Sequence, residues 1–453
     1  MKKEQKKFKS SDVLSDGSIV EMVYDEVAKE TEFAVWDGKE VQYLDKVGGY
    51  YPYPAENHLV SKKVVRFPSE AEEYESEDEL IKDVQKFIHT YLDISPFFEK
   101  IAAYYVCFTW VYDKFSELAY LRALGDYGSG KSRLLKVIGS ICYKPMFCGG
   151  ATTTSPIFRI IDSFRGTLIL DEADYRFSDT TAEIVKILNS GYQRGSPVLR
   201  SEGQGTFEVK SYDVFCPKII ATRKHFSDTA LESRFLIEEM DKKTLRTDIP
   251  INLPDSFEDE ALRLRNKLLM WRFKRFHEVK LVVEDIDRSL EPRLNQIVMP
   301  LFSIIRDDLV RNELKAFIGN YNAELISDRG MSLEGEAFEA YLTITDGGEV
   351  APTIKHIAET LNARLDEKEK ISARRLGGII RNSLKLKARR TNQGWIVSIS
   401  ENIDKIEPLK KKYGIKDVQE PEKVNEVNDV NNNGEQLTII GEKTEPSIES
   451  YFN

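Results

Sequence analysis

The sequence predicts an α/β fold in which a parallel sheet, flanked by helices, is built around a phosphate-binding loop. Between residues 117 and 240, apolar strand-like runs (AYLRAL, TLILDEAD, CPKIIAT) alternate with helical stretches, the pattern of a parallel sheet with crossover helices. The first run leads directly into Gly125-Asp-Tyr-Gly-Ser-Gly-Lys-Ser132, a complete GxxxxGK[ST] sequence, and the helical stretch SRLLKVIGSI follows it. A strand before the glycines and a helix after them is the context that this motif requires.

The composition is that of an ordinary globular protein of about three domains at roughly 150 residues each, since the chain has 453 residues, 41% of them hydrophobic and 31% charged. No apolar run reaches the ~20 residues of a membrane helix, and no apolar region follows the basic N-terminus as in a signal peptide. Four cysteines without CxxC spacing argue against a disulfide framework or a zinc site. We therefore expect a cytoplasmic protein that makes no membrane contact. Because the net charge is -10, nucleic-acid binding would need local basic patches.

The period of the apolar residues divides the chain into segments. Alternating runs separated by Asp-Gly pairs indicate strands near the N-terminus. Beyond about residue 417, Glu, Asn, Val and Lys dominate, which predicts a disordered tail. The expected segments are a β-rich module at 1–67, an acidic connector with helices at 68–116, an α/β core at 117–245, a helical lid at 246–334, a helix-helix-hairpin domain at 335–400 and a tail at 401–453.

The glycine-rich loop predicts a site for ATP and Mg²⁺. Glycines let backbone amides curl around the phosphates, and the helix N-terminus adds a positive dipole. Lys131 would contact the β- and γ-phosphates, and Ser132 would bind Mg²⁺. Forty residues after Lys131, a buried strand ends in Asp171-Glu172; we assign Asp171 to the metal and Glu172 to the general base that polarises the attacking water. The loop residues expected at the nucleotide are Gly125, Asp126, Tyr127, Gly128, Ser129, Gly130, Lys131 and Ser132.

A third strand, KIIAT, ends in Thr222-Arg223 and precedes Ala-Leu-Glu-Ser-Arg234-Phe. Here the chain resembles the AAA+ ATPases, especially the replicative helicase-like proteins of phages, plasmids and other mobile elements, over about residues 117–320. The resemblance implies that Thr222 or Arg223 senses the nucleotide, and that Arg234 reaches the γ-phosphate bound to the next subunit of a ring, a hexamer. The family most often has Asn at the first sensor, so the Thr-Arg pair departs from its pattern. The alternative for Arg234 is an ion pair within its own chain.

The same resemblance implies a second sensor arginine in the helical lid. Arg293 is our choice, and Arg263 and Arg265 are its rivals.

The segment from 335 to 400 predicts a winged-helix domain. A helical stretch that begins at Pro352 precedes a basic run, and alternating residues around Asn392-Gln-Gly394 suit a hairpin wing. In that order the second helix would enter the major groove of duplex DNA. A solvated charged face, or a winged helix that binds protein, is the alternative. The basic residues, which are not interrupted by an acid, are Arg374, Arg375, Arg381, Lys385, Lys387, Arg389 and Arg390.

The interval between the second and third strands of the core contains Arg194 and Arg200. DNA-translocating AAA+ rings project a hairpin from this interval into their channel, so Arg194 and Arg200, with Tyr192, are candidates for following a single strand by charge and stacking. Gly191 and Gly195 would permit the turn. A surface loop near the nucleotide is the alternative.

The C-terminus reads Glu445-Pro-Ser-Ile448-Glu-Ser-Tyr451-Phe452-Asn453. It is similar to the peptide with which archaeal and eukaryotic replication proteins bind the sliding clamp, although Glu445 stands where that peptide has Gln. Apolar residues at the end of a polar tail usually await a pocket. A chance apolar end is the alternative.

Three functions fit these patterns. The first is an ATP-driven DNA helicase or translocase in the replication of a virus or mobile element. The second is a DNA-bound initiator, loader or regulator that uses ATP as an assembly switch without unwinding. The third is a protein-remodelling ATPase. The basic winged helix favours the first two, and the arginines of the core interval mildly favour the first.

Overall fold

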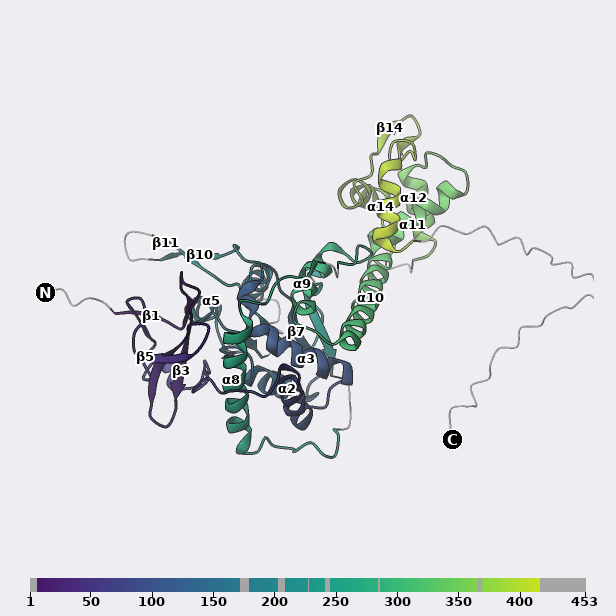
Figure 1. Cartoon of the computed structure of the whole chain (residues 1–453). Coiled ribbons are helices and arrows are strands. Elements are labelled where there is room, and N and C mark those ends of the chain that lie inside the picture. Colours follow the sequence, from purple (N-terminus) through teal and green to yellow (C-terminus); the bar gives the residue numbers. More distant parts are fainter. Residues whose placement is uncertain are drawn as a thin grey trace, which may run out of the picture. The chain divides into compact units, whose positions relative to one another are not determined.

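The computed structural model describes residues 6–171, 179–202, 208–226, 228–240, 245–283, 286–365 and 369–415. The chain forms two compact units, residues 1–325 and 326–453 (Figure 1). Among the described residues, no helix is both long and apolar enough to cross a membrane.

The first unit begins with a small antiparallel sheet. Glycines with positive φ, Gly17 at 90° and Gly38 at 98°, allow the tight turns between its strands. The central strand, β3, is buried along Ile19–Val23, so both of its faces are covered. The strands, in the order in which they pair, are β2 (Ser11–Val13), β3 (Ile19–Asp25), β4 (Glu30–Trp36) and β5 (Val41–Leu44), and β1 (Lys7–Lys9) pairs separately with β6 (Tyr50–Pro52).

The connector contains two substantial helices whose starts are capped by serines. The Ser76 and Ser95 side chains accept from backbone amides of their own first turns, as N-caps do. Residues 101–109 are all buried, which explains their unbroken apolar sequence. The elements are α1 (His58–Ser61), α2 (Glu77–Tyr91), α3 (Pro96–Thr109) and a 3-10 turn at Tyr112–Lys114.

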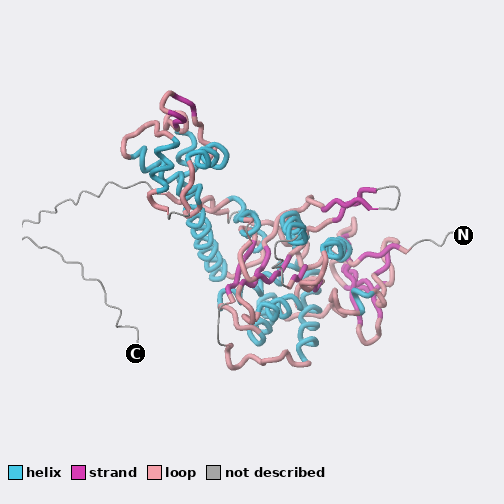
Figure 2. Tube along the Cα trace, turned by 180° about the vertical axis from the view of Figure 1, so that it is seen from behind, coloured by secondary structure: helices cyan, strands magenta, loops and turns pink. Residues whose placement is uncertain are grey.

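A five-stranded, wholly parallel sheet flanked by helices forms the middle of the first unit, which confirms the predicted α/β class (Figure 2). The helical lid and the winged helix remain predictions. In the order in which they lie side by side, the strands are β13 (Phe235–Glu239), β7 (Tyr120–Leu124), β12 (Lys218–Thr222), β9 (Leu168–Leu170) and β8 (Met146–Cys148). The helices between them are α4 (Lys131–Ser140), α5 (Thr154–Phe164), α6 (Asp179–Ser190) and α7 (Thr229–Glu232).

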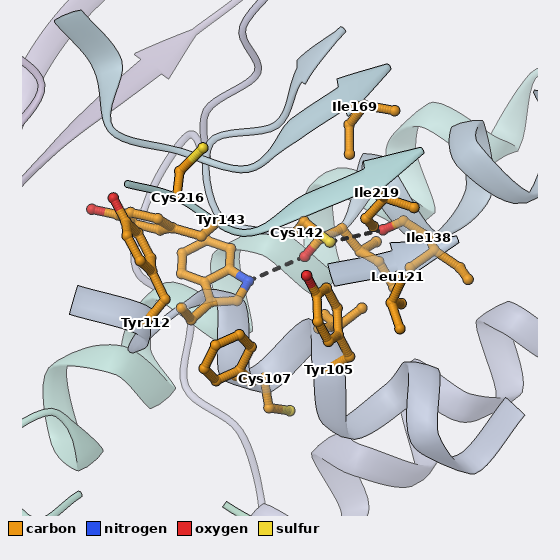
Figure 3. Packing of buried hydrophobic residues seen from close by; sticks show 14 of the residues in the cluster. Tyr105, Cys107, Tyr112, Leu121, Ile138, Cys142, Tyr143, Ile169, Cys216 and Ile219 are labelled. Atoms are coloured by element: carbon orange, nitrogen blue, oxygen red, sulfur yellow. Dashed lines mark hydrogen bonds between the residues drawn. The ribbon is translucent and has the colours of Figure 1, made fainter. Parts of the chain in front are cut away.

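The core of this unit packs α3 against the sheet (Figure 3). The Tyr105 hydroxyl donates to the carbonyls of Ala119 and Lys218, 3.1 and 3.2 Å away, and so satisfies backbone on two segments that enter neighbouring strands. The indole of Trp110 donates to the Ile141 carbonyl at 3.1 Å. These buried polar atoms are therefore paired, as the interior requires.

The helices that follow the sheet join it to the N-terminal strands through buried charges. Arg272 of α8 (Ser256–Arg275) donates to Glu21 of β3 at 2.8 Å and to Asp113 at 2.7 and 2.9 Å. Tyr143 donates to the same Glu21 carboxylate at 2.7 Å, and Lys144 lies 3.4 Å from it. These contacts join α8 and the segment before β8 to the N-terminal sheet, which belongs to the first unit. Two further helices are α9 (Pro292–Phe302) and α10 (Asp308–Gly330).

The second unit has its own hydrophobic core, which includes Phe338, Tyr341, Ile357, Leu376 and Val397. Its last helix ends at Gly414, whose φ of 69° permits a left-handed cap. Its elements are α11 (Leu333–Asp346), α12 (Ile354–Asn362), α13 (Ala373–Gly378), a π-helical turn at Ile379–Ser383, β14 (Arg389–Thr391), β15 (Gly394–Ile396) and α14 (Ile403–Tyr413).

Candidate nucleotide site

The glycine-rich loop joins β7 to α4 in a conformation that suits phosphate binding. Gly128 and Gly130 have φ of 79° and 95°, values that other residues rarely adopt. Gly130 is the N-cap of α4, so the first amides of that helix are available to an anion. The Lys131 ammonium donates to the carbonyls of Gly125 and Asp126, both at 2.6 Å, and therefore lies across the loop itself.

Strand order brings other predicted residues to this edge. Parallel strands end on the same side of a sheet, and β12 lies between β7 and β9. The Gly125 amide accordingly donates to the Thr222 carbonyl at 3.2 Å. Asp171 directly follows β9, and its amide donates to the Cys148 carbonyl at 3.1 Å. The P-loop, Thr222 and Asp171 thus share the carboxyl edge of the sheet, whereas Glu172 lies outside the described residues.

The two sensor candidates differ in their surroundings. Thr222 is buried, and its hydroxyl has no hydrogen-bond partner within the described part of the chain. Arg223 is exposed, and its guanidinium lies 5.6 Å from the ring of Tyr127, a loop residue that is 86% exposed. Both are therefore next to the loop, Thr222 below the surface and Arg223 on it.

The residues fit the expected cofactors. Ser132 and Asp171 offer a hydroxyl and a carboxylate, the hard oxygen donors that Mg²⁺ prefers. The described residues contain no group of three or more His, Cys, Asp or Glu side chains that could hold a metal without a nucleotide. Ser132 and Asp171 are therefore the side chains that would hold a Mg²⁺ here.

Arg234 lies at the opposite, amino edge of the sheet. It immediately precedes β13, where Phe235 pairs with Tyr120, while Glu239 at the other end pairs with Leu124 beside the loop. A five-residue strand spans about 16 Å at ~3.3 Å per residue. The Arg234 side chain is buried, donates to the Asn189 side chain and lies 4.1 Å from the Tyr192 ring centroid. Within one chain, then, Arg234 does not reach the P-loop.

The candidates for the second sensor, Arg293, Arg265 and Arg263, differ in where they lie. Arg293 donates to the Ala230 carbonyl at 3.2 Å and lies 3.4 Å from the Ser233 hydroxyl, so the structure brings it to the Arg234 turn and not to the P-loop. Arg265 is buried and donates to the carbonyls of Phe67 and Ser140. Burial lowers the pKa of Arg265 to about 10. Arg263 is exposed on α8.

Arg194 and Arg200, the two candidates between β9 and β12, lie in different surroundings and do not form one cluster. Arg194 donates to the carbonyls of Asp113 and Phe115 at 2.7 and 3.1 Å. Arg200 lies on a separate ribbon, β10 (Val198–Glu202) paired with β11 (Glu208–Tyr212), which leaves the body of the unit in Figure 1. Its guanidinium is 3.5 Å from Glu183. A hairpin therefore exists in this interval, but it begins after Gly195 and contains neither Tyr192 nor Arg194.

One arginine beside the loop was not singled out from the sequence. Arg133, in the first turn of α4, donates to the carbonyls of Tyr91, Pro250 and Ile251 at 2.8, 2.6 and 2.8 Å. It ties the α2–α3 connection and the segment after β13 to the start of the P-loop helix. The sequence could have indicated this role only through the position of Arg133, two residues after the lysine of the P-loop. The partners of Arg133 are backbone carbonyls that lie far away in the sequence, so no local pattern predicts the contacts.

The seven basic residues of the second unit's basic run are all exposed. It covers α13, the π-helical turn and the β14–β15 hairpin, and the Arg381 guanidinium lies 5.3 Å from the ring of Trp395, which is 44% exposed. Arg389 pairs with Glu401 at 3.0 Å. Arg374 and Arg375 make no side-chain hydrogen bond or ion pair with any described residue. The residues of the C-terminal peptide, Glu445, Ile448, Tyr451 and Phe452, lie outside the described residues.

No protein-family model and no curated protein matches the sequence. Solved structures match at low similarity. The apo NrS-1 C terminal region is 12% identical with a TM-score of 0.35, and the match covers 84% of this chain and 96% of that one. A structure described as the active helicase Cch of SCCmec type IV is 12% identical with a TM-score of 0.42, over 89% of this chain and 80% of that one. Similarity at this level does not indicate the activity of this chain.

Proposed function

We propose that this chain is an ATP-hydrolysing AAA+ motor that acts as a DNA helicase or translocase in the replication of a virus or mobile element. The observation that carries the proposal is the meeting of the P-loop, Thr222 and Asp171 at one edge of a parallel sheet. The exposed basic residues of the second unit support DNA as the partner.

In the proposed reaction, loop amides and Lys131 bind the triphosphate, and Glu172 accepts a proton from the attacking water. Ser132 and Asp171 would hold a Mg²⁺, which would neutralise phosphate charge. Because Arg234 lies about 16 Å from its own loop, its proposed contact with a γ-phosphate would be at the site of the next subunit in a hexameric ring. Thr222 and Arg223 would relay the state of the γ-phosphate. Arg293, beside the Arg234 turn, would serve the same interface.

The experiment is ATP turnover measured with and without single-stranded DNA, followed by unwinding of a forked duplex, with Lys131→Ala as the inactive control. Stimulation of turnover by single strands together with unwinding supports the helicase. Turnover that single strands do not stimulate, and a fork that stays annealed, would contradict it.

The second candidate is an ATP-switched initiator or loader. Arg374 and Arg375 on α13, whose side chains make no hydrogen bond or ion pair with any described residue, favour it, because such arginines are available to position the protein on the phosphates of a duplex site. ATP-dependent assembly on duplex DNA without unwinding is the result that selects this candidate.

A further inference from the structure

A polar cavity lies at the amino edge of the parallel sheet, opposite the P-loop. Its volume is about 420 Å³. Tyr112, Tyr143, Arg165 and Phe215, which line it, each lie in the segment that enters one of the parallel strands β7, β8, β9 and β12. Ser11 to Val13 of the N-terminal sheet and residues 272 and 276 complete its wall. We name this space the amino-edge cavity.

The cavity carries an excess of positive charge. Its lining includes four cations, Lys114, Arg165, Arg194 and Arg272, and three carboxylates, Asp12, Asp113 and Asp213. Asp113 is bound by Arg272 at 2.7 Å, and Asp12 by Lys9 at the same distance. Burial acts to raise the pKa of Asp113, but the neighbouring Arg272 charge outweighs it and holds that pKa below its usual value. Once these pairs are set aside, three cations face one carboxylate.

Arg165 is the cation that is most open to a ligand. It caps the C-terminus of α5 in the left-handed conformation, at φ 50° and ψ 54°, where glycine is usual. Its carbonyl accepts from the Tyr112 hydroxyl at 3.0 Å, so its backbone is anchored. Its guanidinium is exposed and makes no hydrogen bond or ion pair with any residue the structure describes.

Two further cations are positioned by aromatic rings. Lys114 Nζ lies 4.8 Å from the Phe276 centroid, and the Arg194 guanidinium lies 4.9 Å from that of Phe215. Arg194 is also fixed by the Asp113 and Phe115 carbonyls. Since these ring faces already hold cations, the cavity offers positive charge and donors more than a surface for stacking. Arginine donors of this kind match phosphate oxygens.

We propose that the amino-edge cavity binds a phosphodiester group of single-stranded nucleic acid, with Arg165 and Lys114 as its main contacts and Arg194 as a fixed donor behind them. The proposal rests on the proposed function, because it names a second place where the motor holds its strand. A recess between strand-entry loops and the N-terminal sheet admits one flexible backbone, whereas a rigid duplex presents its phosphates on a convex surface.

The test measures binding of a fluorescent oligo(dT) of thirty residues to the full-length chain across a range of salt concentrations. Replacing Arg165 and Lys114 together by Gln should lower the salt slope by about 1.4, near 0.7 per lost single-strand contact, and weaken binding by roughly tenfold at 150 mM salt. Arg165→Lys alone, which keeps the charge, should retain most of the affinity. The matched control replaces Lys29 and Lys62 by Gln, two exposed cations that do not line the cavity.

Each outcome decides a different point. An unchanged salt slope in the Arg165/Lys114 variant, or an equal loss of affinity in the Lys29/Lys62 control, overturns the proposal that the cavity binds the strand. If single-stranded DNA still stimulates ATP turnover by the wild type in that case, the proposed function stands. A wild type that binds no single strand overturns both. Inorganic tripolyphosphate is the competitor that separates the sources of phosphate. Displacement of the strand from the Lys131→Ala variant, which has lost the P-loop lysine, by tripolyphosphate at a much lower phosphate concentration would assign the cavity to a free polyphosphate instead. Matching thermal melting of all variants excludes misfolding as the cause.

Discussion

Lys131 spans the carbonyls of Gly125 and Asp126, so its ammonium already lies where the loop curls. Phosphate oxygens are better partners for an ammonium than neutral carbonyls, because they add the attraction between opposite charges to the hydrogen bond. The lysine is therefore positioned to turn from its own loop to a nucleotide.

We predict that Lys131→Ala abolishes nucleotide binding, and that Glu172→Gln binds ATP but hydrolyses it at least about 10²-fold more slowly, as the loss of a general base usually does. Fluorescent-nucleotide titration and phosphate release measure the two effects. Lys136→Ala, an exposed position on the same helix, is the control and should retain turnover. Unchanged turnover in Glu172→Gln would remove Glu172 from its assigned role.

Lys144 provides a prediction about pH. Burial lowers its pKa from 10.5 to about 8, against the opposing attraction of Glu21. Because the unfolded chain holds this proton more tightly, the burial penalty is complete below pH 8 and shrinks as pH rises towards 10.5. The unfolding free energy of the wild type should therefore rise between pH 7.5 and 9.5 relative to that of Lys144→Met. Urea denaturation of both proteins measures this difference, and a pH-independent difference contradicts the shift.

At the level of elements, the P-loop and Arg234 occupy opposite ends of adjacent strands, which predicts that catalysis needs two subunits. Wild type should assemble into a ring with ATP. Mixing Arg234→Ala with Lys131→Ala subunits should recover part of the activity that each has lost, because some interfaces then join an intact loop to an intact arginine. Turnover and light scattering of the mixture are the measurements. A monomer that is fully active at every protein concentration would exclude the role in trans.

The second unit predicts a salt-dependent duplex contact. Replacing Arg374, Arg375 and Arg381 together by Gln should weaken duplex binding and reduce the salt slope by up to about three, near 0.9 per phosphate. ATP turnover without DNA should hardly change. Replacing Lys355, Lys411 and Lys412, exposed cations on α12 and α14, is the matched control. If the slope stays the same, the basic face binds protein.

The helices and strands show which parts of the fold can be predicted from local sequence patterns. Local patterns predicted the parallel sheet, the P-loop and its helix, because glycines, apolar runs and acids after a strand act over a few residues. They did not give the strand order, which depends on packing between segments a hundred residues apart. The prediction for Arg293 did not anticipate its contacts at the Arg234 turn for the same reason. Likewise, nothing local in Arg165 or Lys114 indicates that the two line one cavity.

At the scale of the whole molecule, we predict that the last fifteen residues bind a sliding clamp. Ile448, Tyr451 and Phe452 lie three and four positions apart and would share one side of a helical turn formed on docking. Burial of these side chains contributes several kcal/mol of binding free energy at ~25 cal/mol per Å². Because ordering the segment offsets much of that free energy, micromolar affinity is expected. Titration of the peptide against the host clamp measures it. Replacing Tyr451 and Phe452 by Ala should abolish binding, and Glu445→Gln should tighten it. No binding of the wild-type peptide at several hundred micromolar would contradict the clamp.

The buried charges around Glu21 also determine when, during synthesis on the ribosome, the N-terminal sheet can complete its packing. Tyr143 and Lys144 emerge about 120 residues after Glu21, but Arg272 is 251 residues away. At roughly 5–20 residues per second, that interval lasts about 13 to 50 seconds. Throughout it, the carboxylate on the central strand of the first sheet lacks the guanidinium that neutralises it in the finished protein. The sheet that contains Glu21 is therefore synthesised well before the helix that completes its packing.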